Sequence, residues 1–571
     1  MIASVAVGAL AVWRAGPTNS LRYKYDLALP PLPSTIRPSM LLTPILALGR
    51  APLVDYLWIR ATKLKEEGHF FDAYQLSEMI CELQPKFAPV WAFQGWNMAY
   101  NISVTLKSPE ERWRWVRNGY ELIRDRGIPL NPTNTQLYRE LAWILFHKVG
   151  DTMDEWHSYY KLQFALIVED ILGEPPDDYV RPGRVRGDFY RDYDFQSLAD
   201  APQHIETLLK ERPDVASFAE ELRAFEFDVS ENGVYLGLLK GLRDGTVQIP
   251  NTPEGMKETR LAALRKLMED PKTELTRKAL ENFWRADRLR KELKLDPARI
   301  VELQKGLGVT LDFRLAQTHA LYWANMGIEK GLDTHSLVDI HRLNTTRIEF
   351  FCLQKMFYGG RMAMSRQADL GEPPNFGPDI RMAPVLFEAY QRDSKEYLRE
   401  ENQGTPISIN FMTGFVGFAR NAILRYSELG MDDKGREMFD FLRKYYDDPM
   451  YAGGYNKFLE KQFIEDKKNL DLVKATARIE NLILGGLKQY AYDEDEEAVR
   501  YLNRAKQVYD VYRRDLTSKR LDIPRKFPEI VKDVAERIGP QMYPGTYNII
   551  RRKLGLPPIV DLAATSQPAS R

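Results

Sequence analysis

Apolar residues recur at intervals of three and four positions along most of the chain from about residue 54 onward. This spacing places them on one face of an α-helix, and Gly, Pro and Asn-Pro pairs separate the successive helical patterns. Alternating apolar and polar runs with hairpin signals are nearly absent, and the best strand candidate is the short segment 243–250. The pattern therefore predicts an all-α protein.

One helix start can be identified directly in the segment SPEERWRWV. Ser108 and Glu111 have the capping-box spacing, in which each side chain binds a backbone N–H of the first turn. Pro109 occupies a position where a missing N–H costs nothing. We expect a helix over 109–126.

The same spacing of small and apolar residues returns along the chain. Counting from Val54, the eighth, eleventh, fifteenth, twentieth and thirty-second positions are occupied by Ala61, Leu64, Gly68, Ala73 and Pro85. Small residues at positions eight and twenty allow two antiparallel helices to approach closely, and the proline ends the second helix. Six residues after Pro85 the pattern begins again in WAFQGWNMAYN, with Trp91, Gly95 and Met98 at positions four, eight and eleven.

Later units are less regular. The next matching proline is Pro132, so the second unit has extra residues, which we place around ISVTLKSPEE (102–111). The pattern then resumes with Tyr138, Leu141, Ala142 and Leu145. Near the carboxyl end, two further units are indicated by Tyr426, Gly430 and Phe439 and by Leu482, Gly486, Ala498, Leu502 and Ala505.

These positions resemble the tetratricopeptide repeat, over 54–172 and again over 411–515. The resemblance implies an α-α superhelix, a right-handed solenoid of paired antiparallel helices. An irregular helical region would occupy 173–410, and helices and a tail would occupy 516–571. The segments DYLWIRA, WAFQGWNMAYNISV, ERWRWVRNGYELIRDRGIPLNP and LYRELAWILFHKVG also look like those of bacterial membrane-anchored repeat proteins with no assigned biochemical role.

The amino terminus has two interpretations. Residues 1–13 are apolar and uncharged, but a spanning helix needs about 20 such residues. Residues 1–27 are either a signal-anchor whose real start lies upstream of Met1 or a segment that packs on the body. The many prolines of 28–53 favour extended backbone and indicate a linker. We expect a membrane-associated protein with a single amino-terminal anchor, in the periplasm or elsewhere in the cell envelope.

Charge and motifs narrow the range of functions. Lys plus Arg and Asp plus Glu both number 80, so no net field attracts a nucleic acid, and we expect no nucleic-acid partner. Cys81 and Cys352 lie in apolar helical patterns typical of core residues. The histidines lack the spacing of zinc hydrolases, and phosphate-loop, dinucleotide and nucleophile-elbow motifs are absent. We therefore expect no metal site, no cofactor and no catalytic residues.

Seven of the ten tryptophans fall within 58–156, interleaved with arginines. Asn97 and Asn101 are four residues apart and share a helix face next to Trp96. In tetratricopeptide domains the first helices of successive units line a concave groove, where asparagines bind an extended peptide. The resemblance therefore implies a partner-binding site at Trp96, Asn97, Asn101, Arg139 and Lys148. The alternative is that these side chains fill or cap gaps between helices.

The resulting hypothesis is a non-catalytic scaffold that binds a protein or peptide through a concave groove at a membrane or cell envelope. Two alternatives remain. An enzyme would have a helical-cleft active site in 173–410, with several acids converging in one pocket. A structural subunit of a larger membrane-associated assembly would pack through its convex faces, with exposed aromatic patches away from the groove.

Overall fold

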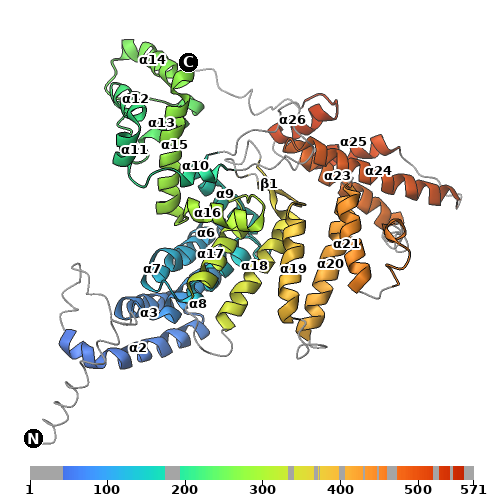
Figure 1. Ribbon diagram of the computed structural model, residues 1–571, viewed down its shortest axis with the longest axis horizontal. Coiled ribbons are helices and arrows are strands. Elements are labelled where there is room, and N and C mark those ends of the chain that lie inside the picture. Colours follow the sequence, from blue (N-terminus) through green and yellow to red (C-terminus); the bar gives the residue numbers. More distant parts are fainter. Residues whose placement is uncertain are drawn as a thin grey trace, which may run out of the picture. The chain divides into compact units, whose positions relative to one another are not determined.

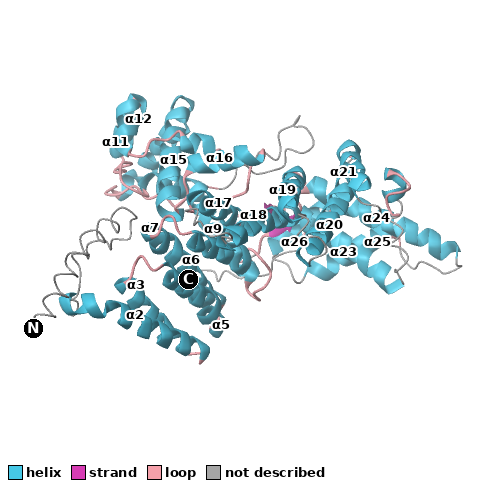
Figure 2. Ribbon diagram, turned by 60° about the horizontal axis from the view of Figure 1, so that its bottom comes forward, coloured by secondary structure: helices cyan, strands magenta, loops and turns pink. Residues whose placement is uncertain are grey.

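Helices form most of the described backbone in the computed structural model, which also has one pair of short strands (Figures 1 and 2). The predicted all-α class is therefore confirmed. The structure describes residues 43–173, 193–331, 340–364, 371, 373–397, 406–428, 431–445, 449–459, 472–518, 526–539 and 544–558. The expected anchor 1–27 and the linker up to residue 42 lie outside the described residues.

The chain divides into two units, and neither is continuous in sequence. The first contains residues 1–160, 290–295 and 316–352, and the second contains 161–289, 296–315 and 353–571. In the first unit the elements are α2 (Thr43–Glu66), α3 (Phe70–Leu83), α4 (Ala88–Trp96), η2 (Asn97–Ile102), α5 (Ser103–Thr105), α6 (Pro109–Leu122), η3 (Ile123–Gly127), α7 (Ile128–Leu130), α8 (Thr135–Trp143), η4 (Ile144–Val149) and α17 (Ala316–Lys330). The elements η2, η3 and η4 are π-helical turns inside longer helices.

Part of the expected linker is helical. Helix α2 begins at Thr43, so residues 43–53 are not extended as the proline content suggested. Pro44 lies in the first turn, where the missing N–H has no intrahelical partner to lose, and Pro52 lies inside the helix on its exposed side. Proline density alone therefore overestimated the length of the linker.

Small residues determine how closely the two helices of each of the first two pairs approach one another, as the repeat positions predicted. Ala61 of α2 and Ala73 of α3 are fully buried. Gly95 of α4 faces Gly119 of α6 so closely that a Cβ on Gly119 would lie 2.6 Å from the Gly95 carbonyl oxygen. The extra residues of the second pair lengthen its helices, which run from Ala88 to Thr105 and from Pro109 to Leu130.

Two aromatic side chains repeat the same anchoring contact. The Trp91 indole N–H donates to the Pro85 carbonyl oxygen at 2.9 Å, and the Tyr138 hydroxyl donates to the Pro132 carbonyl oxygen at 2.8 Å. In both cases the aromatic residue follows the proline by six positions. The contact fixes the start of each new helix against the end of the previous pair.

The helix that pairs with α8 comes from far along the chain. Helix α17 runs antiparallel to α8 and η4, because Gly327 faces Tyr138, Gly331 faces Thr135, and Gln317 donates to the Gly150 carbonyl oxygen at 2.6 Å. Residues 151–315 are therefore inserted between the two helices of this pair. Helix α17, which lies within 173–410, thus packs in the first unit beside helices of 54–172.

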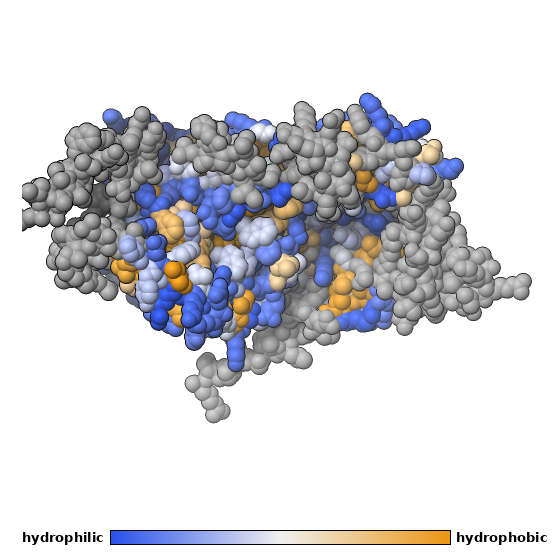
Figure 3. All heavy atoms as spheres, turned by 90° about the horizontal axis from the view of Figure 1, so that it is seen from below, coloured by the Kyte–Doolittle hydropathy of each residue, from blue (hydrophilic) through white to orange (hydrophobic). Residues whose placement is uncertain are grey.

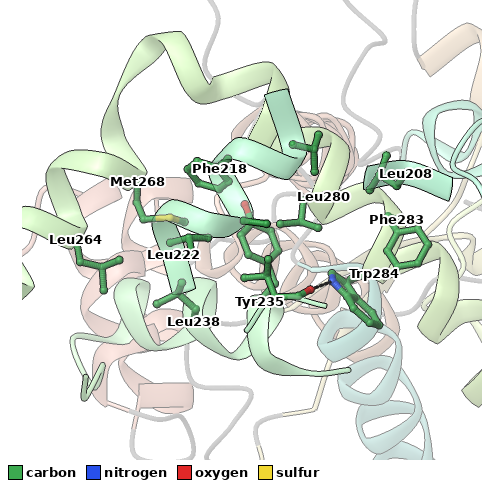
Figure 4. Packing of buried hydrophobic residues seen from close by; sticks show 13 residues of the cluster. Leu208, Phe218, Leu222, Tyr235, Leu238, Leu264, Met268, Leu280, Phe283 and Trp284 are labelled. Carbon is green, nitrogen blue, oxygen red and sulfur yellow. Dashed lines mark hydrogen bonds between the residues drawn. The ribbon is translucent and has the colours of Figure 1, made fainter. Parts of the chain in front are cut away.

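The second unit begins with an inserted helical bundle that has its own core (Figure 4). Buried residues from Leu208 to Trp284 form this core, and the Trp284 indole donates to the Val229 carbonyl oxygen at 3.0 Å. The segment 243–250, the best strand candidate of the sequence, does not form a strand: α13 extends to Asp244, and the following residues are irregular. Up to residue 307 the elements of this unit are α9 (His157–Leu172), which begins in the first unit, α10 (Phe195–Ala199), α11 (Ile205–Glu211), α12 (Pro213–Arg223), α13 (Val234–Asp244), η6 (Glu254–Met256), α14 (Lys257–Glu269), η7 (Pro271–Thr273), α15 (Glu274–Arg288) and α16 (Pro297–Leu307). The π-helical turn η8 (Leu289–Leu293) follows α15 directly, and its residues 290–293 belong to the first unit.

Two matching Asp-x-Arg turns stand in the middle of the second unit. Arg314 donates to both carboxylate oxygens of Asp312, and Arg381 does the same to Asp379. Arg314 is fully buried and also binds Glu169 at 3.0 Å and the Met362 carbonyl oxygen at 2.9 Å. Arg314 therefore links Asp312 and Glu169 to the Met362 backbone. Arg381 links Asp379 to the Thr310 hydroxyl.

The remaining elements complete the second unit. Strands β1 (Arg361–Ala363) and β2 (Asn375–Gly377) pair antiparallel, with Met362 opposite Phe376. In the carboxyl part, a Cβ on Gly486 would lie 3.1 Å from the Ala498 carbonyl oxygen, so the predicted small pair again meets. The helices are α18 (Ile340–Gly359), which begins in the first unit, α19 (Met382–Tyr397), α20 (Pro406–Glu428), α21 (Asp432–Tyr445), α23 (Leu472–Ala491), α24 (Asp495–Ser518), α25 (Phe527–Ile538) and α26 (Pro544–Lys553).

Candidate functional site

Four aromatic side chains form two stacked pairs that meet through a tilted ring contact, and we name this row the aromatic ladder. Its members are Trp96 and Tyr100 of α4 and η2, and Trp143 and His147 of α8 and η4. The ring centroids of Trp96 and Tyr100 are 5.2 Å apart, those of Tyr100 and His147 are 5.9 Å apart, and those of His147 and Trp143 are 4.8 Å apart. All four side chains are partly buried.

The local sequence explains why these rings meet. Trp96 and Tyr100 are four residues apart, as are Trp143 and His147, so each pair lies on one helix face. Both pairs fall at the ninth and thirteenth positions of the repeat units that the sequence predicts. The close Gly95–Gly119 contact and the Trp91–Pro85 hydrogen bond fix α4 in place and so define where the first pair points.

A cation lies at one end of the ladder. The Lys65 ammonium, from α2, is 4.7 Å from the centroid of the Trp96 ring and 5.5 Å from that of Phe93. Within the described part of the chain Lys65 has no ion pair. Its charge is therefore held against aromatic faces and remains available to an anionic group.

The centre of the ladder contains a polar contact. The Tyr100 hydroxyl lies 3.2 Å from His147 Nδ1. Burial, with a smaller contribution from the nearby Glu140 carboxylate, raises the pKa of Tyr100 well above its ordinary value. Tyr100 therefore stays a neutral hydrogen-bonding group at any physiological pH.

The two asparagines have different environments. Asn97 is fully buried, and its amide donates to the Phe70 carbonyl oxygen at 3.2 Å, which joins η2 to the start of α3. Asn101 is partly buried and donates to the Asn97 side-chain oxygen at 2.7 Å. Asn97 thus holds two helices together, whereas Asn101 keeps one amide hydrogen and its oxygen for other contacts.

Lys148 is buried in an ion cluster under the ladder. Its ammonium donates to Asp154 at 2.6 Å, and Arg112 lies 3.9 Å from the same carboxylate. Burial disfavours the charge of Asp154, but hydrogen bonds from Lys148 and from the Trp156 backbone N–H hold its pKa below the ordinary value. Lys148 also lies 5.4 Å from the Tyr100 ring centroid, so it supports the ladder from behind.

Arg139 lies away from the ladder and is partly buried. It forms an ion pair with Glu140, and its Nη1 atom is 2.8 Å from His341 Nδ1 on α18. The structure therefore brings Trp96, Asn97 and Asn101 together, places Lys148 behind them, and leaves Arg139 occupied by its own neighbours.

Two indole groups of the ladder are open donors. Neither Trp96 nor Trp143 donates its N–H to another described residue, whereas those of Trp91 and Trp284 are bound to carbonyl oxygens. The ladder thus offers two indole N–H groups, the Asn101 amide and the Lys65 ammonium beside apolar ring edges. Such a set suits a ligand rich in hydrogen-bond acceptors.

Sequence reasoning missed Lys65, Tyr100, Trp143 and His147. A signal was present, because an aromatic residue or histidine occupies positions nine and thirteen in two successive units. Counting these positions would have identified the ladder without the structure. The place of Lys65 depends on the packing of α2, which the sequence pattern does not define.

Comparison with protein-family models, with curated proteins and with solved structures finds no match to this chain. Among the described residues, no helix is both long and apolar enough to cross a membrane. The described residues also contain no group of three or more side chains suited to hold a metal ion.

Proposed function

We propose that the protein is a non-catalytic scaffold that binds an acceptor-rich, extended segment of a partner protein along its aromatic ladder. The observation that supports this proposal is that the indole N–H groups of Trp96 and Trp143 donate to no described residue. Each indole ring is held in place by stacking, Trp96 on Tyr100 and Trp143 on His147. Trp and Tyr supply much of the binding energy at protein interfaces, since they combine apolar area with a polar tip and have few rotamers to lose.

The mechanism is preorganisation. Stacking fixes the rings before a partner arrives, so binding loses little side-chain entropy. Backbone carbonyl groups of the partner would accept from the two indoles and from Asn101. An acidic side chain of the partner would meet Lys65.

We propose further that the helix pairs of the first unit are tetratricopeptide-like and stack into a right-handed superhelix. Supporting this are the buried small residues at positions eight and twenty and the repeated contact between an aromatic residue and the proline six positions earlier. The ladder would then lie on the concave side, where the first helices of successive units meet.

In this proposal the five site residues expected from the sequence have different roles. Trp96 and Asn101 would touch the partner. Asn97 and Lys148 are positioning residues in this proposal, because both are buried and act through their neighbours. Arg139 would contact the partner only if its ion pair with Glu140 breaks.

The test is affinity capture from cells with the membrane fraction retained. Lys65→Glu and Trp143→Ala should each reduce the yield of the principal partner at least tenfold, while Trp115→Ala on α6 should leave it unchanged. Circular dichroism establishes that each variant is folded. Equal yields from all four proteins would contradict the proposal.

A second candidate function is supported by a different surface. Phe71 and Tyr74 of α3 each place their ring centroid 5.5 Å from that of Trp115 on α6, edge to face, and Phe71 is 47% exposed. This patch lies on the second helices of two pairs, away from the ladder. It favours a structural subunit that packs through its second helices, in which case Trp115→Ala would lose the partner and Trp143→Ala would not.

Location at a membrane or cell envelope is also a proposal. It rests on the apolar, uncharged sequence of residues 1–13. Cell fractionation of the full chain and of a form that lacks residues 1–27 tests it. The full chain should sediment with membranes and the shortened form should not; sedimentation of both would contradict a single amino-terminal anchor.

A further inference from the structure

Two asparagines of the chain, Asn118 and Asn232, are followed directly by glycine. An asparagine deamidates fastest when glycine follows it, because glycine has no side chain to obstruct the approach of its backbone nitrogen to the asparagine amide. Both asparagine side chains are exposed to solvent. Neither the dipeptide nor its exposure therefore distinguishes the two sites, and any difference must come from the backbone.

Asn118 lies inside helix α6, which runs from Pro109 to Leu122. In an α-helix the N–H of Gly119 binds the carbonyl four residues earlier, and the helical ψ angle keeps its nitrogen turned away from the Asn118 side chain. Gly119 is also buried, and a Cβ on it would lie 2.6 Å from the Gly95 carbonyl oxygen. The backbone at Asn118 therefore cannot rotate unless α6 opens.

Asn232 lies in the exposed turn between α12 and α13. Gly233 has a left-handed backbone with a φ of 82° and directly precedes Val234, the first residue of α13. Within the described part of the chain the Gly233 N–H donates to no other group, and an added Cβ on Gly233 would have nothing within 4 Å. The nitrogen of Gly233 is therefore held neither by a helical hydrogen bond nor by packed neighbours.

We propose that Asn232 is a site of spontaneous deamidation, whereas Asn118 is protected by its helix. The Gly233 backbone nitrogen attacks the side-chain carbonyl carbon of Asn232 and loses its proton. A new C–N bond closes a succinimide ring, and the side-chain nitrogen of Asn232 leaves as ammonia. Water then opens the ring at either of its carbonyl carbons and gives aspartate or isoaspartate, so no oxidant or reductant is needed.

The two products have different consequences for the inserted bundle. Both place a negative charge just before the first turn of α13, where the helix dipole favours it. Isoaspartate also adds one carbon to the main chain of a turn that is held on both sides. The Trp284 indole donates to the Val229 carbonyl oxygen at 3.0 Å, and the Tyr235 hydroxyl donates to the Arg277 carbonyl oxygen at 3.2 Å. The isoaspartate form should therefore loosen this turn, whereas the aspartate form should not.

Peptide mapping of the full chain by mass spectrometry, after increasing times at neutral pH, tests the proposal. Deamidation raises the mass of a peptide by about 1 Da. The peptide that contains Asn232 should gain this mass at least about tenfold faster than the peptide that contains Asn118, which reacts only when α6 opens. In guanidinium chloride, where both segments are unfolded, the two rates should become similar. Asn232→Gln should remove the product at this position and leave the rate at Asn118 unchanged, because the longer side chain closes a ring more slowly.

Two results would overturn the proposal. Asn232 could stay unmodified in the folded chain although it reacts in guanidinium chloride, or both asparagines could react equally fast in the folded chain. The consequence for the turn has its own measurement, limited proteolysis of the aged protein against Asn232→Asp, which carries the charge without the extra carbon. The isoaspartate fraction should be cleaved in this turn faster than Asn232→Asp, and equal cleavage would contradict the loosening. This inference is independent of the aromatic ladder, because no residue is shared.

Discussion

At the scale of single residues, a few atoms determine how closely the helices of the first unit approach. A Cβ on Gly95 would lie 2.5 Å from Ile123 Cδ1 and 2.9 Å from the Gly119 carbonyl oxygen. One of these neighbours is backbone and cannot move without shifting α6. Neither Gly95 nor Gly119 has a positive φ angle. Glycine is therefore required at these positions only because a side chain would not fit.

Gly95→Ala should therefore lower the free energy of unfolding of the first unit by about 1–3 kcal/mol, the usual cost of overpacking. Gly237→Ala is the matched control, because Gly237 also lies within a helix but has nothing within 4 Å of its added Cβ. The control should be neutral or gain up to about 1 kcal/mol, since alanine favours helix more than glycine. Urea unfolding followed by circular dichroism measures both, and an equal response of the two variants would contradict the steric explanation.

The Lys148–Asp154 pair gives a prediction with a defined pH dependence. Both residues are buried, so Lys148→Met leaves an uncompensated carboxylate and should cost about 3–5 kcal/mol at pH 7. Lys63→Met, which removes an exposed i,i+4 pair with Glu67, should change stability by less than about 1 kcal/mol.

The sign follows from the direction of the pKa shift. The pKa of Asp154 is lowered in the folded protein, so its contribution to stability is complete above the unfolded pKa of about 3.9 and is lost as pH falls through the lower folded value. In Lys148→Met, the buried Asp154 carboxylate has lost this partner, so its charge is unfavourable. Protonation of Asp154 at low pH removes that charge. The stability difference between wild type and variant should therefore shrink from pH 7 to pH 3 in urea titrations, and a constant difference would contradict this explanation.

At the scale of elements, α17 completes a helix pair whose other member ended long before it in sequence. Gly331 is placed so that a Cβ there would lie 3.5 Å from the Cβ of Thr135, which is within the range for a disulfide. The contact joins residues on either side of the insertion. It therefore provides a direct test of the pairing.

Thr135→Cys with Gly331→Cys should form a disulfide under mild oxidation without a loss of helical signal. Mass spectrometry of the digested protein, with and without reductant, detects the crosslinked peptides. Thr135→Cys alone and Gly331→Cys alone are the controls, and neither should give this crosslink. The native Cys81 and Cys352 are buried and free, so they should not interfere.

The elements that the sequence predicted are those whose determinants are local. Ser108 accepts a hydrogen bond from the Glu111 backbone N–H at 3.2 Å, so the predicted helix start is confirmed. The helix itself continues past residue 126 through η3 and α7. By contrast, the pairing of α8 with α17 and the β1–β2 ladder depend on distant segments that no local spacing reveals.

The candidate site was predictable only in part, for a related reason. The position of Trp96 and Asn101 on a first-helix face followed from the repeat spacing. The burial of Asn97 did not, because it depends on how far the start of α3 leans toward η2. An amide at a helical position has the same sequence pattern whether its partner is a ligand or a neighbouring backbone carbonyl.

At the scale of the whole molecule, hydrophilic side chains surround small separate groups of apolar ones on the described part of the face shown in Figure 3. The chain divides into two units with separate internal contacts, so heating should give more than one unfolding transition. Gly95→Ala should lower only the transition of the first unit. Phe218→Ala, which opens a cavity in the core of the inserted bundle, should lower only the other, by about 3–5 kcal/mol.

Differential scanning calorimetry distinguishes these outcomes. Two transitions that respond separately to the two substitutions would fit the division into units. A single transition that both substitutions shift equally would contradict it. The comparison needs only the full chain and the two single variants.

The insertion between α8 and α17 has a consequence during synthesis. When α8 leaves the ribosome, its helical partner has not yet been translated, and residues 151–315 must be made first. At about 5–20 residues per second this delay is on the order of ten seconds or more. During this time the side of α8 that contacts α17 stays uncovered on the nascent chain. We therefore expect this protein to need chaperones at this stage more than an array of consecutive helical hairpins would.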